Sequence, residues 1–187
     1  MRTRGGIGRG FVNDIAVTWF GAKTLKVIDA FVGGRGLTRI GGRSTVGPEI
    51  DQAANHFLWA CSILAPSLFA TEPRIGAEAS NDGSVLLIVP SGAGTDTARL
   101  EFEDGALSSY YALRYKEKGG PRIGWRVTYE GWHEESGIML PSRISVAWDD
   151  DAGPWFVMDL EAFTANADLE GRLEAVATLI REAKRQR

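Results

Sequence analysis

The stretch Arg99-Leu-Glu-Phe-Glu-Asp-Gly-Ala-Leu-Ser-Ser-Tyr-Tyr-Ala-Leu-Arg-Tyr115 decides the fold. Its central Asp104 and Gly105 suit the two positive-φ positions of a tight hairpin turn. Before this turn lies the run Arg99-Leu-Glu-Phe, and after it lies a tyrosine-rich run from Leu107 to Tyr115, as is typical of strands. We therefore expect two antiparallel strands that pair directly across Asp104 and Gly105.

Turn signals rich in glycine, asparagine and aspartate recur on both sides of this hairpin and predict a meander of nearest-neighbour strands. The expected strands are 75–80, 84–90, 96–103, 106–115, 122–130, 141–149 and 155–163. Nearer the N-terminus, two β-prone runs, 11–20 and 24–32, flank Gly21 to Lys23 at a spacing that suits a hairpin. A short third strand is expected at 37–40.

Two segments change to a helical period. Gly47-Pro48-Glu49 is a helix start, because proline suits the first helical turn, and the helix is expected from Glu49 to Ile63 with Phe57, Leu58 and Cys61 facing the core. Pro66 stops this helix or starts a short second turn. A C-terminal helix is expected over 168–187, ending in basic residues that suit the negative end of the dipole.

The composition favours an α+β class made mainly of antiparallel strands. The chain has 187 residues with 23 glycines and six tryptophans, which suits strands joined by tight turns better than a helix bundle. No linker or internal repeat divides it, so we expect a flexible leader at 1–10 and a single domain at 11–187 that includes the C-terminal helix.

Charge and cysteine content restrict the partners. The net charge of −3 gives no global electrostatic reason to expect nucleic acid or an anionic membrane as a partner. The single Cys61 excludes an internal disulfide and a cysteine-based metal site. No run approaches the roughly 18 apolar residues of a membrane helix, and the basic N-terminus lacks an apolar signal region. As written, the chain is expected to be soluble and cytoplasmic, and a trimmed N-terminus would leave its location open.

The usual catalytic and metal-binding patterns are weak here. Neither Gly6 to Gly10 nor Gly33 to Gly36 follows a strand and opens a helix, so neither predicts a phosphate loop. His56 and His133 stand without partner spacing. The run Asp149-Asp150-Asp151 lacks the further carboxylates of a calcium loop. We therefore predict no catalytic residue, no metal site and no cofactor.

Aromatic residues and arginine are dense in the C-terminal half. Period-two alternation places Tyr110, Ala112 and Arg114 on one face of their strand, and Trp125, Val127 and Tyr129 on one face of the next. A plain sheet core is one interpretation of this pattern. The other is a concave, mostly apolar pocket for a lipid-like or other apolar small molecule, with Arg114 able to pair an anionic headgroup. The expected ligand-binding residues are Arg114, Trp125, Tyr129, Trp148 and Phe57.

Two alternatives remain open beside the binding module. An enzyme of unknown reaction would need polar groups such as Arg114, Asp29, His56 and Glu101 to converge in the same cavity. A structural or partner-binding protein would use the terminal helix or a sheet edge as its contact surface. No residue spacing supports the enzyme, and the oligomeric state is open.

Several segments in order resemble a family of uncharacterised bacterial proteins known as a domain of unknown function. They are Asp29-Ala-Phe-Val-Gly-Gly-Arg-Gly-Leu, Gly47-Pro-Glu-Ile-Asp, Leu64-Ala-Pro-Ser-Leu, Leu100-Glu-Phe-Glu-Asp-Gly-Ala-Leu, Leu113-Arg-Tyr and Leu140-Pro to Val146-Ala-Trp, spread over residues 11–163. The resemblance implies a fold similar to the bacterial lipoprotein carriers (lipoprotein-localisation factors): a strongly curved antiparallel sheet, or half-barrel, with a central helix in its mouth. It implies a scaffold and no reaction. The chain departs from the family in lacking an N-terminal membrane segment and an acidic residue near Cys61.

Overall fold

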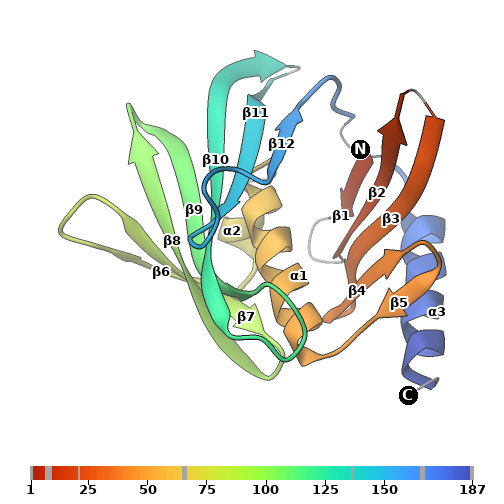
Figure 1. Ribbon diagram of the computed structural model, residues 1–187. Helices are drawn as coiled ribbons and strands as arrows, with labels where there is room; N and C mark the ends of the chain where they lie inside the picture. The colour runs from red at the N-terminus through yellow and green to blue at the C-terminus, as the bar shows by residue number, and fades with distance from the viewer. Residues whose placement is uncertain are drawn as a thin grey trace. The chain divides into compact units, whose positions relative to one another are not determined.

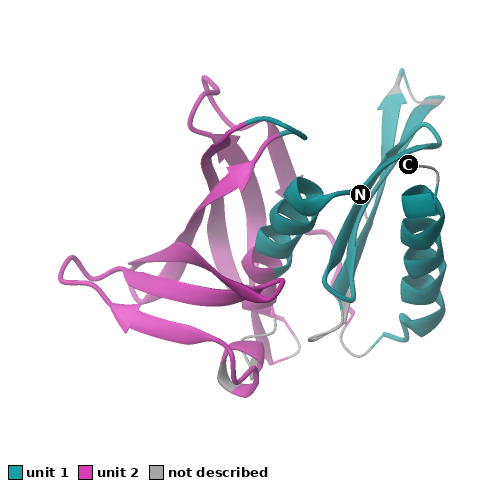
Figure 2. Cartoon of the chain, turned by 90° about the horizontal axis from the view of Figure 1, so that it is seen from below, with its two compact units in different colours: residues 1–58, 117–120, 166–187 teal, residues 59–116, 121–165 magenta. Residues whose placement is uncertain are grey.

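The structure is a computed structural model that describes residues 2–6, 10–20, 22–64, 67–135, 137–164 and 167–185. It is made mostly of antiparallel strands, with one central and one C-terminal helix, as the sequence predicts. The chain divides into two compact units, shown in Figure 2. Unit 1 comprises residues 1–58, 117–120 and 166–187, and unit 2 comprises 59–116 and 121–165. Each unit contains one sheet.

Unit 1 holds a five-stranded antiparallel sheet in sequential order (Figure 1). Its strands are β1 (Arg2–Gly6), β2 (Gly10–Trp19), β3 (Ala22–Val32), β4 (Arg35–Ile40) and β5 (Arg43–Thr45). The C-terminal helix α3 (Glu170–Arg185) covers one face of this sheet. Its apolar stripe, Leu173, Val176 and Ile180, packs on a cluster that includes Val12 and Leu37. This packing buries the apolar side of an otherwise polar helix.

The other face of the same sheet meets the central helix α1 (Pro48–Cys61). Phe11 and Phe31 pack there against Ala54, and Phe57 and Leu58 contact this cluster. The approach is close: a Cβ at Gly36 would lie 2.4 Å from the carbonyl oxygen of Ile50, so only glycine fits. Gly33 and Gly34 form the turn, and Gly36, the second residue of β4, is the point at which the strand approaches the helix.

Unit 2 holds the seven-stranded meander that the turn signals predict. In sequence order its strands are β6 (Gly76–Ala79), β7 (Val85–Ser91), β8 (Gly94–Glu103), β9 (Ala106–Tyr115), β10 (Arg122–Glu135), β11 (Ile138–Trp148) and β12 (Phe156–Asp159). The deciding hairpin is confirmed, because Glu103 pairs with Ala106 and the turn residues Asp104 and Gly105 have φ values of 51° and 80°. A one-turn helix η1 (Ser62–Leu64) and the short α2 (Ser67–Thr71) precede the meander.

The strands form two sheets, whereas the sequence suggested a single one. The helices α1 and α2 lie between β5 and β6 in the chain, and these two strands do not pair. The seven-stranded sheet is open, with β6 and β12 at its edges. The half-barrel curvature and the single-domain assignment stay predictions. The stop at Pro66 falls outside the described residues.

Two further segments differ from expectation. Part of the expected flexible leader forms β1, in which Arg2 to Gly6 pair with β2. The segment around Trp132 and His133 lies between the expected strands 122–130 and 141–149, which predicts a hairpin tip, but in the structure it lies within β10, which continues to Glu135. Gly131 adopts a φ of 65° inside this strand, so the glycine accommodates a local distortion and does not end the strand.

Among the described residues, no helix is long and apolar enough to cross a membrane.

Candidate functional site

The buried face of the seven-stranded sheet is the apolar face of unit 2. It is formed by side chains that alternate along β7 to β11: Leu87, Val89, Ala98, Tyr110, Ala112, Trp125, Val127, Tyr129, Ile144, Val146 and Trp148. The strand register aligns them in rows: Ala112 opposes Trp125, which opposes Trp148. The alternation inferred for β9 and β10 is therefore confirmed.

Arg114 lies at the end of this aromatic row. Its guanidinium carbon is 4.4 Å from the ring centre of Trp125 and 5.6 Å from that of Trp148. Trp125 in turn meets Tyr110 edge to face, with the ring centres 6.2 Å apart. The negative faces of aromatic rings attract a cation. The two tryptophans therefore hold the arginine charge against an otherwise apolar, buried face.

The end of α1 and the helical segment after it belong to the same site. The hydroxyl of Tyr129 donates a hydrogen bond of 2.7 Å to the carbonyl oxygen of Ala60. Trp59 is buried, and its ring centre lies 6.2 Å from that of Phe69 in α2. These contacts anchor the last turn of α1 to the meander within unit 2.

The electrostatics of this face reflect its low polarity. Desolvation raises the pKa of the Cys61 thiol to about 12, and the nearby Arg114 charge acts in the opposite direction. Burial raises the pKa of Tyr110 well above its usual value, and here too Arg114 opposes the shift. Arg114 is thus close enough to influence both groups. In such surroundings a guanidinium can form a strong, charge-assisted pair with a carboxylate or a phosphate.

The structure brings together four of the five residues proposed as ligand-binding. Arg114, Trp125, Trp148 and Tyr129 share the apolar face of unit 2. Phe57 belongs to unit 1, where its ring centre lies 4.8 Å from that of Phe11. Sequence reasoning missed Trp59 and did not connect Cys61 with Arg114. The helical period placed Cys61 on an apolar face but carried no signal for which strand that face would meet.

The polar groups considered for an enzyme are not gathered on this face. Glu101 points to the opposite side of the sheet, where it accepts hydrogen bonds from Ser109 and Arg126 at 2.7 and 2.6 Å. Asp29 and His56 belong to unit 1. Within unit 2, Arg114 therefore stands apart from that set.

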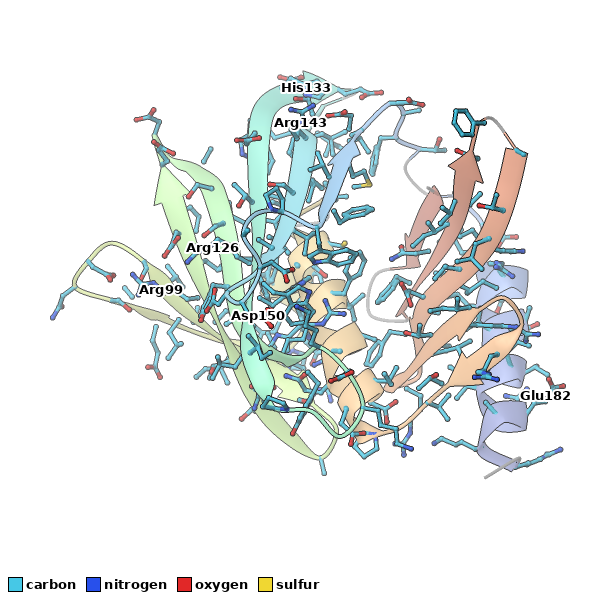
Figure 3. All side chains as sticks on the ribbon, viewed as in Figure 1. Arg99, Arg126, His133, Arg143, Asp150 and Glu182 are labelled. Atoms are coloured by element: carbon cyan, nitrogen blue, oxygen red, sulfur yellow. The ribbon has the colours of Figure 1, made fainter. Side chains whose placement is uncertain are left out.

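The opposite side of the sheet carries a ladder of ion pairs. Arg99 contacts Asp82 at 2.6 Å and Glu101 at 3.4 Å, and Arg126 continues the row. Figure 3 shows Arg99 and Arg126 on this side. The hydrogen bond from Ser109, with the charges of Arg126 and Arg99, lowers the pKa of Glu101. Because each charge has a partner across the strands, the ladder serves strand pairing.

The other polar candidates also have structural roles. Asp149 accepts a hydrogen bond of 2.8 Å from the hydroxyl of Tyr111, and Lys116 donates to Asp150 and Asp151 at 2.9 Å each. Among the described residues, no group of three or more histidine, cysteine or acidic side chains could hold a metal ion.

An open pocket of about 340 Å³ lies on unit 1, lined by Asp14, Ile15, Ala16, Thr24, Leu25 and Lys26. It contains none of the proposed ligand-binding residues. Asp14 is paired there with Arg172 of α3, with an Oδ2 to Nε distance of 3.2 Å. An open pocket whose carboxylate already has a partner is a weaker candidate than the Arg114 site.

No curated protein and no solved structure is significantly similar to this chain. The resemblance to lipoprotein carriers therefore has no support from a known structure. A protein family does match: residues 7–160 align with a family of unknown function, DUF6544. These residues include most of both sheets and leave α3 outside the match. The chain therefore belongs to the DUF6544 family.

Proposed function

We propose that the protein is a binding module for an amphiphile with an acidic headgroup, such as a fatty acid, on the apolar face of unit 2. Arg114 forms an ion pair with the headgroup, while Trp125, Trp148 and Tyr129 contact the apolar chain of the ligand. The observation that carries the proposal is the stacking of the Arg114 guanidinium on Trp125 at 4.4 Å. A carrier-like role, suggested by the resemblance to lipoprotein carriers, is the finer form of this proposal.

The supporting argument is energetic. A guanidinium beside aromatic rings on an apolar face is partly dehydrated, and an anionic ligand adds charge-assisted hydrogen bonds to it. The flat guanidinium holds a carboxylate with two parallel bonds, whereas the apolar chain of the ligand gains from contact with aromatic rings. A neutral alcohol of the same chain length keeps the apolar contact with the rings but loses the charge-assisted bonds to the guanidinium. Selectivity for acid over alcohol is therefore the signature of this site.

Intrinsic tryptophan fluorescence tests the proposal, because Trp125 and Trp148 flank Arg114. The purified protein is titrated with palmitate below its micellar concentration and, separately, with hexadecanol. We expect a saturable change with palmitate, and Arg114→Ala should weaken palmitate binding about 10- to 100-fold, the range for hydrogen bonds to a charged group. Hexadecanol should bind equally to both proteins.

Arg143→Ala is the matched control. Arg143 is an exposed arginine on β11 of the same sheet, labelled in Figure 3, and it pairs with Asp159 at 2.7 Å. Its removal should leave palmitate binding unchanged. The absence of a saturable response in the unmodified protein, or equal losses in both variants, would contradict the proposal.

A further inference from the structure

We propose that the tip of the β2–β3 hairpin in unit 1 docks on an anionic lipid surface. Phe20 enters the boundary between headgroups and acyl chains, and Lys26 and Arg43 face the lipid phosphates. The residues involved belong to unit 1, whereas the ligand site proposed above belongs to unit 2. The two proposals therefore rest on different observations and can fail separately.

The hairpin extends beyond the rest of its sheet. Strand β1 pairs with β2 only at Gly10 to Asp14, and β4 pairs with β3 only at Val27 to Val32. Among the described residues, the outer parts of β2 and β3, residues 15–19 and 22–25, have ladder partners only in each other, and at their base the carbonyl oxygen of Lys26 accepts a hydrogen bond from Gly41. Figure 1 shows this ribbon projecting past β1, β4 and β5. A two-stranded ribbon is only marginally stable in water, so its apolar side chains call for a partner surface.

The ribbon carries apolar side chains to its end. Phe20, at the turn, is 97% exposed, and the cross-strand pair Val17 and Leu25 are 43% and 39% exposed. Phe20 also has a positive φ of 47°, a conformation that suits glycine or asparagine better than an aromatic residue. Neither burial nor backbone preference explains a phenylalanine at this position. Contact of its ring with an apolar phase outside the protein would explain it.

Positive charges lie behind this tip at a distance that suits a bilayer. Lys26 pairs with Ala16, four residues before Phe20, which places it about 13 Å from the tip at the usual rise along a strand. Arg43 pairs with Ile40 one residue level further back. Both side chains are exposed, and among the described residues neither forms an ion pair; Asp14, which lines the same pocket as Lys26, is paired with Arg172.

This arrangement favours lipid over a protein partner. An interfacial segment inserts its apolar end roughly 5–10 Å, so cations about 13 Å behind it lie at headgroup level. The net charge of −3 gives the whole chain no attraction to an anionic membrane. Electrostatic attraction to the lipid surface is local, because interactions between charges are screened beyond about 8 Å in physiological salt. The cations nearest the surface, Lys26 and Arg43, therefore determine this attraction.

Vesicle flotation tests the inference. The full chain is floated with vesicles of phosphatidylcholine alone and with vesicles of phosphatidylcholine and phosphatidylglycerol in equal parts. We expect binding to the mixed vesicles, weaker binding to the neutral ones, and a loss of binding in high salt. Phe20→Asn should lower partitioning about tenfold or more, the effect of withdrawing one phenylalanine from an apolar phase.

The choice of asparagine separates docking from folding. Asparagine tolerates a positive φ, so Phe20→Asn should leave the melting temperature unchanged or raise it while it weakens vesicle binding. Phe102→Asn is the matched control, because Phe102 is also an exposed phenylalanine, at 46%, but lies on β8 of unit 2. This control should float as well as the unmodified protein.

A second matched pair tests the charges. Lys26→Glu with Arg43→Glu should abolish the preference for mixed vesicles, whereas Lys184→Glu with Arg185→Glu changes net charge equally at the end of α3 and should preserve it. Failure of the unmodified protein to float with the mixed vesicles would overturn the inference. So would equal flotation of Phe20→Asn and the unmodified protein.

Discussion

At the scale of single residues, Arg114 and Phe20 both occupy positions that folding alone does not favour. Arg114 places a charge on the apolar face of a sheet, held 4.4 Å from Trp125. Phe20 places a large apolar ring in solvent, on a backbone conformation that disfavours it. Residues that conflict with their local environment often serve function, because a protein gains nothing else from the conflict. Both proposals begin from such a residue.

Cys61 links the stability of the protein to alkaline pH. Its native pKa is about 12, and an unfolded cysteine titrates near 8.5. The folded state holds its proton more tightly, so this stabilisation is complete below pH 8.5 and is lost as pH rises toward 12. We expect the stability advantage of the unmodified protein over Cys61→Ala to shrink by about 2 kcal/mol between pH 8 and pH 10.

Urea unfolding at the two pH values, with a reducing agent present, measures this difference. Tyr110 and Tyr129 also have raised pKa values because they are buried. They are present in both proteins, and because the Cys61 thiol stays protonated in the folded state between pH 8 and pH 10, their contributions cancel in the comparison. Identical pH dependence in the two proteins would show that the thiol is not desolvated as described.

Gly36 gives a steric prediction. A Cβ there would lie 2.4 Å from the Ile50 carbonyl oxygen and 3.1 Å from the Ala54 side chain, so Gly36→Ala must displace α1 from β4. We expect a loss of about 1–3 kcal/mol in the free energy of unfolding, the usual cost of overpacking. In Gly153→Ala the added Cβ meets nothing within 4 Å, and chemical denaturation should show a change of less than about 0.5 kcal/mol.

At the scale of elements, the two helices depend on packing more than on their own propensity. The apolar stripe of α3 meets the five-stranded sheet at Val12, Ile28 and Leu37. The remainder of the helix is polar and exposed, so the helix has little reason to form without this contact. The final turn of α1 depends in the same way on the hydrogen bond from Tyr129 to Ala60.

Ile180 tests the packing of α3. It is 4% exposed against the sheet, and Ile180→Ala should lower the free energy of unfolding by about 2–5 kcal/mol through the loss of buried surface and the cavity left behind. Glu182, labelled in Figure 3, lies two residues further along the helix and is exposed. Glu182→Ala should change stability by less than about 0.5 kcal/mol. Similar effects of the two substitutions in a denaturation series would contradict the docking of α3.

At the scale of the whole molecule, the chain combines two sheets with different contents. The five-stranded sheet of unit 1 is covered by helix contacts from both of its faces. The seven-stranded sheet of unit 2 has one face of buried aromatic and aliphatic residues and one of paired charges. Both proposed functions follow this division, with the ligand in unit 2 and the lipid surface at the end of unit 1.

Local patterns in the sequence determined much of the fold. The Asp104-Gly105 hairpin, the helix start at Pro48, the order of the meander and the shared face of Tyr110, Ala112 and Arg114 all follow from contacts within a few residues. Turn chemistry and periodicity act over that range, so a single sequence is enough to predict them.

Only the tertiary structure decided which of these elements meet. It separated the strands into two sheets, placed Phe57 with Phe11, extended β10 through the segment expected as a turn, and brought Trp148 beside Trp125 and Arg114. The physical reason is that these contacts join residues far apart in the chain. They depend on strand register and on competition among many apolar faces, whereas hydrophobic periodicity says only that a face is buried and not against what.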